Sequence, residues 1–230
     1  MNIPGPIQQP PTSAWSMYRA IVGIGAMCAL LIVTVYQTTA DRIRENQERF
    51  LAAAVSQILP AAQTTVAVVQ TEDGGLEEAV ETLALPVFMG YNADGELVGA
   101  VVTAQGMGYQ DNIRVLYAYS FELDAIVGFK VLDSKETPGL GDKIEKEPHF
   151  LANFEALDAT LTPDGDALLH PIVTVKQGQK LQPWQLDGIT GATITSEAIG
   201  NILNDSANTW APILEKNSHA FAIREISEEQ

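Results

Sequence analysis

Residues 186–196 read Leu186-Asp187-Gly188-Ile189-Thr190-Gly191-Ala192-Thr193-Ile194-Thr195-Ser196. From Asp187 onward, these ten positions hold one acid, two glycines, one alanine and four hydroxyl side chains. An apolar stripe at helical spacing follows, which predicts a helix after the glycines: Ala198, Ile199, Ile202 and Leu203. Small residues let the backbone approach a ligand, and free N–H groups at a helix start favour a phosphate. A threonine there can hydrogen-bond a phosphate or be esterified by one. The alternative is a turn with a hydroxyl-rich helix cap.

The order of the residues in this stretch resembles a known motif. Asp187-x-x-Thr190-Gly191-Ala192-Thr193 is similar to the flavinylation motif Asp-x-x-Ser/Thr-Gly-Ala-Thr/Ser of bacterial FMN-binding domains. In that family, FMN is joined through its phosphate to the hydroxyl of the last motif residue. A dedicated flavin transferase makes the bond, with FAD as donor. The resemblance therefore implies that Thr193, rather than Thr190 or Thr195, carries covalent FMN.

A second segment, Glu136-Thr137-Pro138-Gly139-Leu140-Gly141, resembles the other hallmark of the family, which lies beside the flavin. The two segments occur in the expected order and together are more specific than either alone. The likeness is closest to the G subunit of the Rnf-type (Rsx-type) electron transport complex, and more distant to the C subunit of the sodium-pumping NADH:quinone reductase. It implies these cofactor-binding residues: Glu136, Thr137, Gly139, Leu140, Asp187, Thr190, Gly191, Ala192 and Thr195.

Pro138 and Gly139 predict a tight turn in the second segment. Gly141 keeps side-chain bulk away from a neighbour, and Leu140 offers an apolar contact suited to a flat ring. An ordinary turn from a strand into a helix is the alternative interpretation.

The N-terminal part of the chain predicts a membrane anchor. Residues 1–16 are rich in Pro and Gln, carry no side-chain charge and are expected to be a disordered lead. Residues 20–40 also lack charged side chains, and a helix of 17 to 20 such residues spans roughly 25–30 Å, enough for a hydrocarbon core. We expect an anchor over residues 17–40, flanked by interfacial aromatics. A signal peptide cleaved after Ala40 is the alternative, although a basic start is almost missing.

The charge of the chain is uneven. All 29 acidic residues lie after residue 40, against 12 of the 13 basic residues. This acidic remainder argues against nucleic-acid binding, which needs a basic footprint, and suits partners that carry basic patches.

Metal chemistry has little support in the sequence. Cys28 is the only cysteine and lies in the expected anchor, so a Cys-based zinc or iron–sulfur site is excluded. His149, His170 and His219 are too scattered to suggest a metal cluster, and we expect neither metal ligands nor catalytic residues.

The remaining pattern predicts an α+β domain. Helices are expected over 41–59, 76–83, parts of 141–154 and from Thr193 to Pro212, and Asn92-Ala93-Asp94-Gly95 predicts a hairpin. Strands are expected over 86–91, 96–104, 113–120, 125–132 and 172–176. The expected division is a membrane-proximal part at 41–98, the FMN-binding domain at 99–211 and a C-terminal tail at 212–230, loosely held from Lys216 onward.

Three functions are compatible with these features. The resemblance implies a single-pass flavoprotein of the bacterial inner membrane, with its flavin domain on the periplasmic side. It would relay electrons among membrane and iron–sulfur subunits, after maturation by a flavin transferase. Counting Lys and Arg alone, Arg42, Arg44 and Arg49 would instead place the domain in the cytoplasm, but long domains translocate largely regardless of charge. The alternatives are a flavin-dependent reductase acting on a small substrate and a flavin-free assembly module of the same fold.

Overall fold

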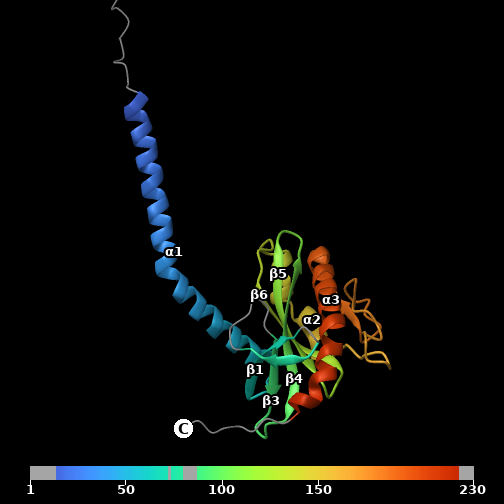
Figure 1. Cartoon of the computed structure of the whole chain (residues 1–230). Helices are drawn as coiled ribbons and strands as arrows, with labels where there is room; N and C mark the ends of the chain where they lie inside the picture. The colour runs from blue at the N-terminus through green and yellow to red at the C-terminus, as the bar shows by residue number, and fades with distance from the viewer. Residues whose placement is uncertain (1–13, 72–73, 80–86, 223–230) are drawn as a thin grey trace, which may run out of the picture. The chain divides into compact units, whose positions relative to one another are not determined.

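The computed structural model describes residues 14–71, 74–79 and 87–222, and the chain forms two compact units, Met1–Phe50 and Leu51–Gln230 (Figure 1). The expected lead therefore lies outside the described residues as far as residue 13, and the expected tail from residue 223.

The first helix, α1 (Ala14–Ile58), continues through the boundary expected at residue 40. Its segment Ala14–Ala40 has a mean hydropathy of 2.1 and is long and apolar enough to cross a membrane, a test that an N-terminal signal sequence also passes. Residues 14–16 are helical and not part of the expected lead. Trp15 and Tyr18 stack there with ring centroids 6.0 Å apart. The helix ends just before Pro60, because a proline disfavours helical geometry at the residue that precedes it.

The second unit is built on a seven-stranded antiparallel sheet of order β2-β1-β3-β4-β5-β6-β7. Its strands are β1 (Thr64–Gln70), β2 (Leu76–Glu78), β3 (Val87–Tyr91), β4 (Leu97–Met107), β5 (Asn112–Ser120), β6 (Ala125–Asp133) and β7 (Leu157–Asp158). The hairpin expected between β3 and β4 is confirmed. The side chain of Asn92 accepts hydrogen bonds from the N–H groups of Asp94 and Glu96, and Gly95 has φ +77°.

Helix α3 (Thr193–Ser218) covers one face of the sheet and lies beside β4 (Figure 1). Its buried Ile199 and Leu203 join a core that includes Val115 and Tyr117 of β5. Burying a large aliphatic side chain stabilises a fold by roughly 1.5–3 kcal/mol, so this stripe fixes α3 on the sheet. The hydroxyls of Tyr117 and Ser206 lie 3.0 Å apart within the same contact.

The last turns of α1 cover part of the opposite face. Val55 and Ile58 pack there against Val101 and Leu116. Gly128 of β6 lies directly against the Ile58 carbonyl, where any Cβ would collide with the backbone. A glycine is therefore required at this position of β6.

Short helices and two further strands connect β6 to α3. They are η1 (Gly141–Glu145), α2 (Pro148–Leu151), η2 (Ala152–Glu155), β8 (Val173–Val175) and β9 (Gln185–Asp187), with β8 and β9 paired in parallel. Beyond α3 comes the short η3 (His219–Phe221).

Several expected elements differ in the structure. The helix expected over 76–83 is wrong where the chain is described, because Leu76 is buried and residues 76–78 pair with β1, itself not expected from the sequence. Residues 80–83 lie outside the described part. Pro148 starts α2 rather than interrupting a helix, since the first turn needs no N–H from it.

Pro212 does not end α3, contrary to expectation. The helix continues to Ser218 because Ala211 and Leu214 are buried on either side of the proline, and this packing outweighs one lost backbone hydrogen bond. Residues 212–218 thus lie in α3, which overlaps the first part of the expected tail. At the other end of the expected flavin domain, β4 runs through position 98/99, so the sheet has no break there.

Candidate functional site

A buried carboxylate joins the two sequence motifs. Glu136 is 6% exposed, and its Oε2 accepts a hydrogen bond of 2.7 Å from the hydroxyl of Thr195, 59 residues away. Its Oε1 accepts another, of 2.9 Å, from the N–H of Gln110. A Cβ at Gly108 would lie 2.6 Å from Oε1, and one at Gly141 would collide with Oε2. Three segments therefore meet at this carboxylate, and two of them need a glycine to do so.

Each motif forms the same kind of turn. In the first, the N–H of Leu140 donates to the carbonyl of Thr137, and Gly139 has φ +79°. In the second, the N–H of Ala192 donates to the carbonyl of Ile189, and Gly191 has φ +84°. A glycine with positive φ at the third position is typical of a type II turn, and the tight turn predicted at Pro138 and Gly139 is confirmed.

The two turns border an open cavity of about 330 Å³. That volume is within the range of small-molecule sites. Its walls come from the loop after β4, from the first motif and from the start of α3, through Tyr109, Thr137, Leu140, Gly141, Gly191, Ala192, Thr193, Ile194 and Thr195. Three of the apolar lining residues are more than half exposed in the chain: Tyr109, Leu140 and Ile194. The cavity thus has an accessible apolar rim.

The three threonines of the second motif differ in their availability. Thr195 is 3% exposed, and its hydroxyl is already donated to Glu136. Thr190 is exposed but does not line the cavity. Thr193 is exposed and lines the cavity, at the first position of α3. Among these three, Thr193 alone combines an accessible hydroxyl with a place in the cavity wall.

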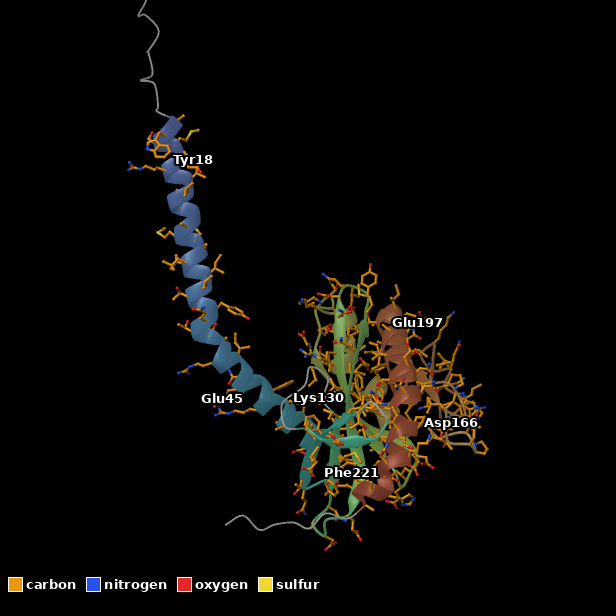
Figure 2. All side chains as sticks on the ribbon, viewed as in Figure 1. Tyr18, Glu45, Lys130, Asp166, Glu197 and Phe221 are labelled. Atoms are coloured by element: carbon orange, nitrogen blue, oxygen red, sulfur yellow. The ribbon has the colours of Figure 1, made fainter. Side chains whose placement is uncertain are left out.

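Ser196 holds the loop that leads to Thr193. Its buried hydroxyl accepts a hydrogen bond from the N–H of Ile189 and donates one to the carbonyl of Ala192. The N–H of Thr190 donates to the side chain of Gln177. These contacts fix the second turn against the start of α3. In Figure 2, the label Glu197 marks this end of the helix.

Four residues expected to bind the cofactor lie outside the cavity wall: Glu136, Gly139, Asp187 and Thr190. The carboxylate of Asp187 accepts a hydrogen bond of 2.7 Å from the N–H of Gly178 and lies 2.8 Å from Nε2 of His149. Its backbone exchanges two hydrogen bonds with the side chain of Asn153. Asp187 therefore ties the motif to η2, α2 and the preceding loop instead of facing the cavity.

Several residues of this site were not among the cofactor-binding residues that the resemblance implied. Ile194 and Gly141 stand inside the two motifs, and Tyr109 stands in a glycine-rich segment, so each had a local signal. Asn153 and His149 had no local signal in the sequence, because they contact Asp187 from more than 30 residues away. Lys143 had none either, and its Nζ lies 3.6 Å from the position that a Cβ on Gly191 would occupy.

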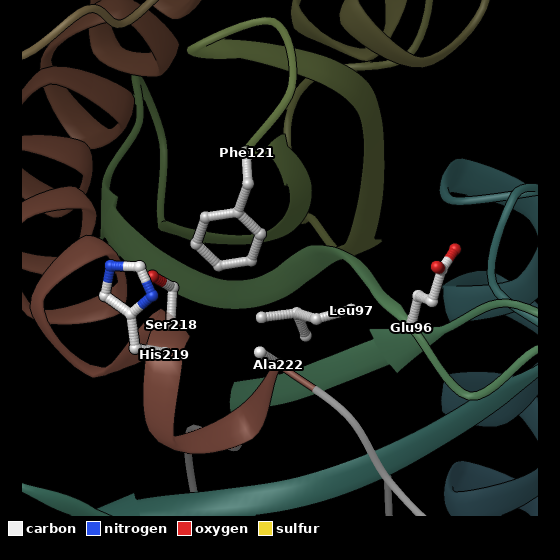
Figure 3. A pocket seen from close by; sticks show the side chains of 6 residues that line it. All are labelled: Glu96, Leu97, Phe121, Ser218, His219 and Ala222. Carbon is white, nitrogen blue, oxygen red and sulfur yellow. The ribbon is translucent and has the colours of Figure 1, made fainter.

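A second cavity, of about 260 Å³, lies at the other end of α3 (Figure 3). A 26-residue helix is about 39 Å long, so this cavity is remote from Thr193. Phe121 and Leu97 form its apolar part, and the N–H of Leu97 donates to the carbonyl of Ala222. It is therefore not part of the site formed by the two motifs.

Comparison with known proteins first defines the class of this domain. The model of the FMN-binding domain family matches residues 108–208, which include both motifs. The fold is similar to that of NqrC from Shewanella oneidensis, with a TM-score of 0.54 and 18% identity over 79% of this chain and 98% of that one. It is also similar to the C subunit of the Na(+)-translocating NADH-quinone reductase from Parabacteroides distasonis, with a TM-score of 0.51 and 24% identity over 66% and 78% of the two chains.

Relatives that this chain matches over most of their length then define the family. The G subunit of the ion-translocating oxidoreductase complex of Methanosarcina acetivorans is 30% identical over 82% of this chain and 89% of its own length. The G subunit of the Na(+)-translocating ferredoxin:NAD(+) oxidoreductase complex of Acetobacterium woodii is 29% identical over 83% and 87%. The chain belongs to the family of G subunits of ion-translocating oxidoreductase complexes, which confirms the resemblance found in the sequence.

The contacts of Asp187 predict a structural cost on its removal. Asp187→Ala leaves the N–H of Gly178 and the His149 ring without this partner, and should lower the free energy of unfolding by about 1–3 kcal/mol. Asp166→Ala is the matched control, because Asp166 is exposed and its ion pair with Lys216 spans 3.8 Å. That change should stay within about 0.5 kcal/mol. Urea titrations of the detergent-solubilised chain measure both, and equal values would contradict a structural role for Asp187.

Proposed function

We propose that this chain is a membrane-anchored flavoprotein subunit that carries FMN as a phosphoester on Thr193. In this proposal it relays electrons within an ion-translocating electron transport complex. The choice of Thr193 as the attachment site rests on how the three motif threonines differ. The hydroxyl of Thr195 is hydrogen-bonded to Glu136, and Thr190 lies outside the cavity wall. Thr193 is exposed and lines the cavity. Membership in this family of G subunits supports the setting.

The residues of the cavity suit a flavin. The exposed apolar side chains of Tyr109, Leu140 and Ile194 offer contact to a flat ring, and Thr137 adds a polar edge. The backbone of Gly191 and Ala192 lets a phosphate approach the start of α3. Glu136 does not line the cavity. Its buried carboxylate accepts the hydrogen bond of Thr195 and so positions one residue of the cavity wall.

The attachment reaction needs an outside donor and enzyme. The hydroxyl oxygen of Thr193 attacks the phosphorus of the FMN half of FAD, the pyrophosphate bond breaks, AMP leaves with the bonding electrons, and the hydroxyl proton is released. A flavin transferase is the partner that this step requires. The chain itself needs only to present the hydroxyl in a fixed loop, which the contacts of Ser196 provide.

Once bound, the flavin supplies the redox chemistry, and the protein sets its position and surroundings. The partners are then the membrane and iron–sulfur subunits of the complex. The excess of acidic residues after residue 40 favours docking faces that carry basic patches.

Thr193→Ala should abolish covalent flavin when the chain is co-expressed with a flavin transferase. Thr190→Ala is the matched control and should keep the bond, because Thr190 does not line the cavity. Thr195→Ala should keep part of it, since that hydroxyl serves Glu136. In-gel fluorescence after denaturation measures all three. Fluorescence that persists in the Thr193 variant would disprove the assignment.

Leu140→Ala should keep the bond at Thr193 but change the visible spectrum and midpoint potential of the flavin, because Leu140 lines the cavity. Leu181→Ala provides the control: Leu181 is 85% exposed, lies outside the cavity wall and should leave both quantities unchanged. Equal spectra and potentials for the two variants, at equal flavin content, would show that Leu140 does not touch the ring.

The location follows from Ala14–Ala40, which we propose anchors the mature chain in the bacterial inner membrane with the flavin domain on the periplasmic side. The chain should stay in the membrane fraction through an alkaline wash. A reporter fused after Gln230 should be active outside the cytoplasm. Activity of cytoplasmic reporters alone would show that the basic residues Arg42, Arg44 and Arg49 set the orientation.

A further inference from the structure

Lys143 brings a positive charge to the second motif. It belongs to η1, and its Nζ lies 3.6 Å from the position that a Cβ on Gly191 would occupy. Gly191 is two residues before Thr193, and two residues span at most about 7 Å. The four-carbon stem of a lysine moves its ammonium over comparable distances. The amine of Lys143 can therefore reach a group bound on Thr193.

The charges around Lys143 leave its amine available. Lys146 is paired with Asp142 at 2.9 Å, and Lys135 with Asp111 at 2.9 Å. The hydrogen bond from Lys146 holds the pKa of Asp142 below its usual range. In residues 14–71, 74–79 and 87–222, no carboxylate pairs with Lys143 within 4.0 Å.

The start of α3 also lacks a negative group that would compete for this amine. The first turn contains no acidic residue, and no side chain caps it. Glu136 is buried, and its two oxygens are engaged by Thr195 and Gln110. A phosphodiester on Thr193 would keep one negative charge beside this turn, in a chain of formal net charge −16.

We infer that the ammonium of Lys143 pairs with the phosphate that links the flavin to Thr193. This inference rests on the proposed function and adds a binding residue that neither sequence motif contains. Lys143 binds the phosphate as a point charge, while the backbone around Gly191 shapes the approach. The contact stabilises the attached group and also attracts the phosphate of the donor before transfer.

The test uses the full chain in detergent, with purified flavin transferase, FAD and three variants. Lys143→Gln removes the charge, Lys143→Arg keeps it, and Lys146→Gln removes a neighbouring charge that is already paired with Asp142. The rate of flavin attachment is followed by in-gel fluorescence. We expect Lys143→Gln to slow attachment by about tenfold at low salt, as for loss of one charge-assisted contact, with Lys143→Arg and Lys146→Gln close to wild type. The difference should shrink at high salt.

A second measurement reads the phosphate directly. In fully flavinylated protein, the ³¹P resonance of the phosphodiester should shift in Lys143→Gln but not in Lys146→Gln. Thermal melting of each variant checks that the fold is retained. Equal rates and equal ³¹P shifts for Lys143→Gln and Lys146→Gln, in a wild-type background that accepts flavin, would overturn the role of Lys143 alone. A wild-type chain that accepts no flavin would overturn the proposed function, and the inference with it.

Discussion

The carboxylate of Glu136 is the constraint on which the geometry of the site depends. A buried carboxylate is costly unless its oxygens accept hydrogen bonds, so Glu136 can stay inside only where donors reach it. The hydroxyl of Thr195 and the N–H of Gln110 are those donors, and they come from different parts of the chain. Satisfying one side chain therefore sets the distance between the two motifs. The glycines at 108 and 141 are a consequence, because a side chain there would displace the carboxylate.

The second constraint is the dual role of α3. Its first residue, Thr193, belongs to the cavity wall, while Ile199 and Leu203 belong to the core that fixes the helix on the sheet. The accessible threonine is thus held by a helix that is anchored in the core of the domain. An electron carrier needs this rigidity more than it needs acid–base groups, since the cofactor performs the chemistry and the protein fixes its position.

Local patterns predicted the long central strands and the site loops well. The apolar residues of β4, β5 and β6 and the turns at Gly95 and Gly139 are local features of the sequence, and these predictions hold. The failures arise where distant contacts decide. Leu76 joins a strand because β1 lies beside it, and α3 passes Pro212 because the residues around it are buried. The site shows the same limit. Thr193 and Leu140 were predicted from motif order and line one cavity, but motif membership does not show which way the side chain of Asp187 points.

The burial of Asp187 has a consequence for how a modifying enzyme can recognise the motif. In the folded domain its side chain is only 8% exposed, whereas Thr193 and Ile194 face outward. An enzyme that binds the folded domain can contact the side chain of Thr193 but not that of Asp187, at the other end of the motif. A transferase that modifies the folded domain therefore depends on Asp187 only indirectly, through the contacts with Gly178 and His149 that hold the motif in place.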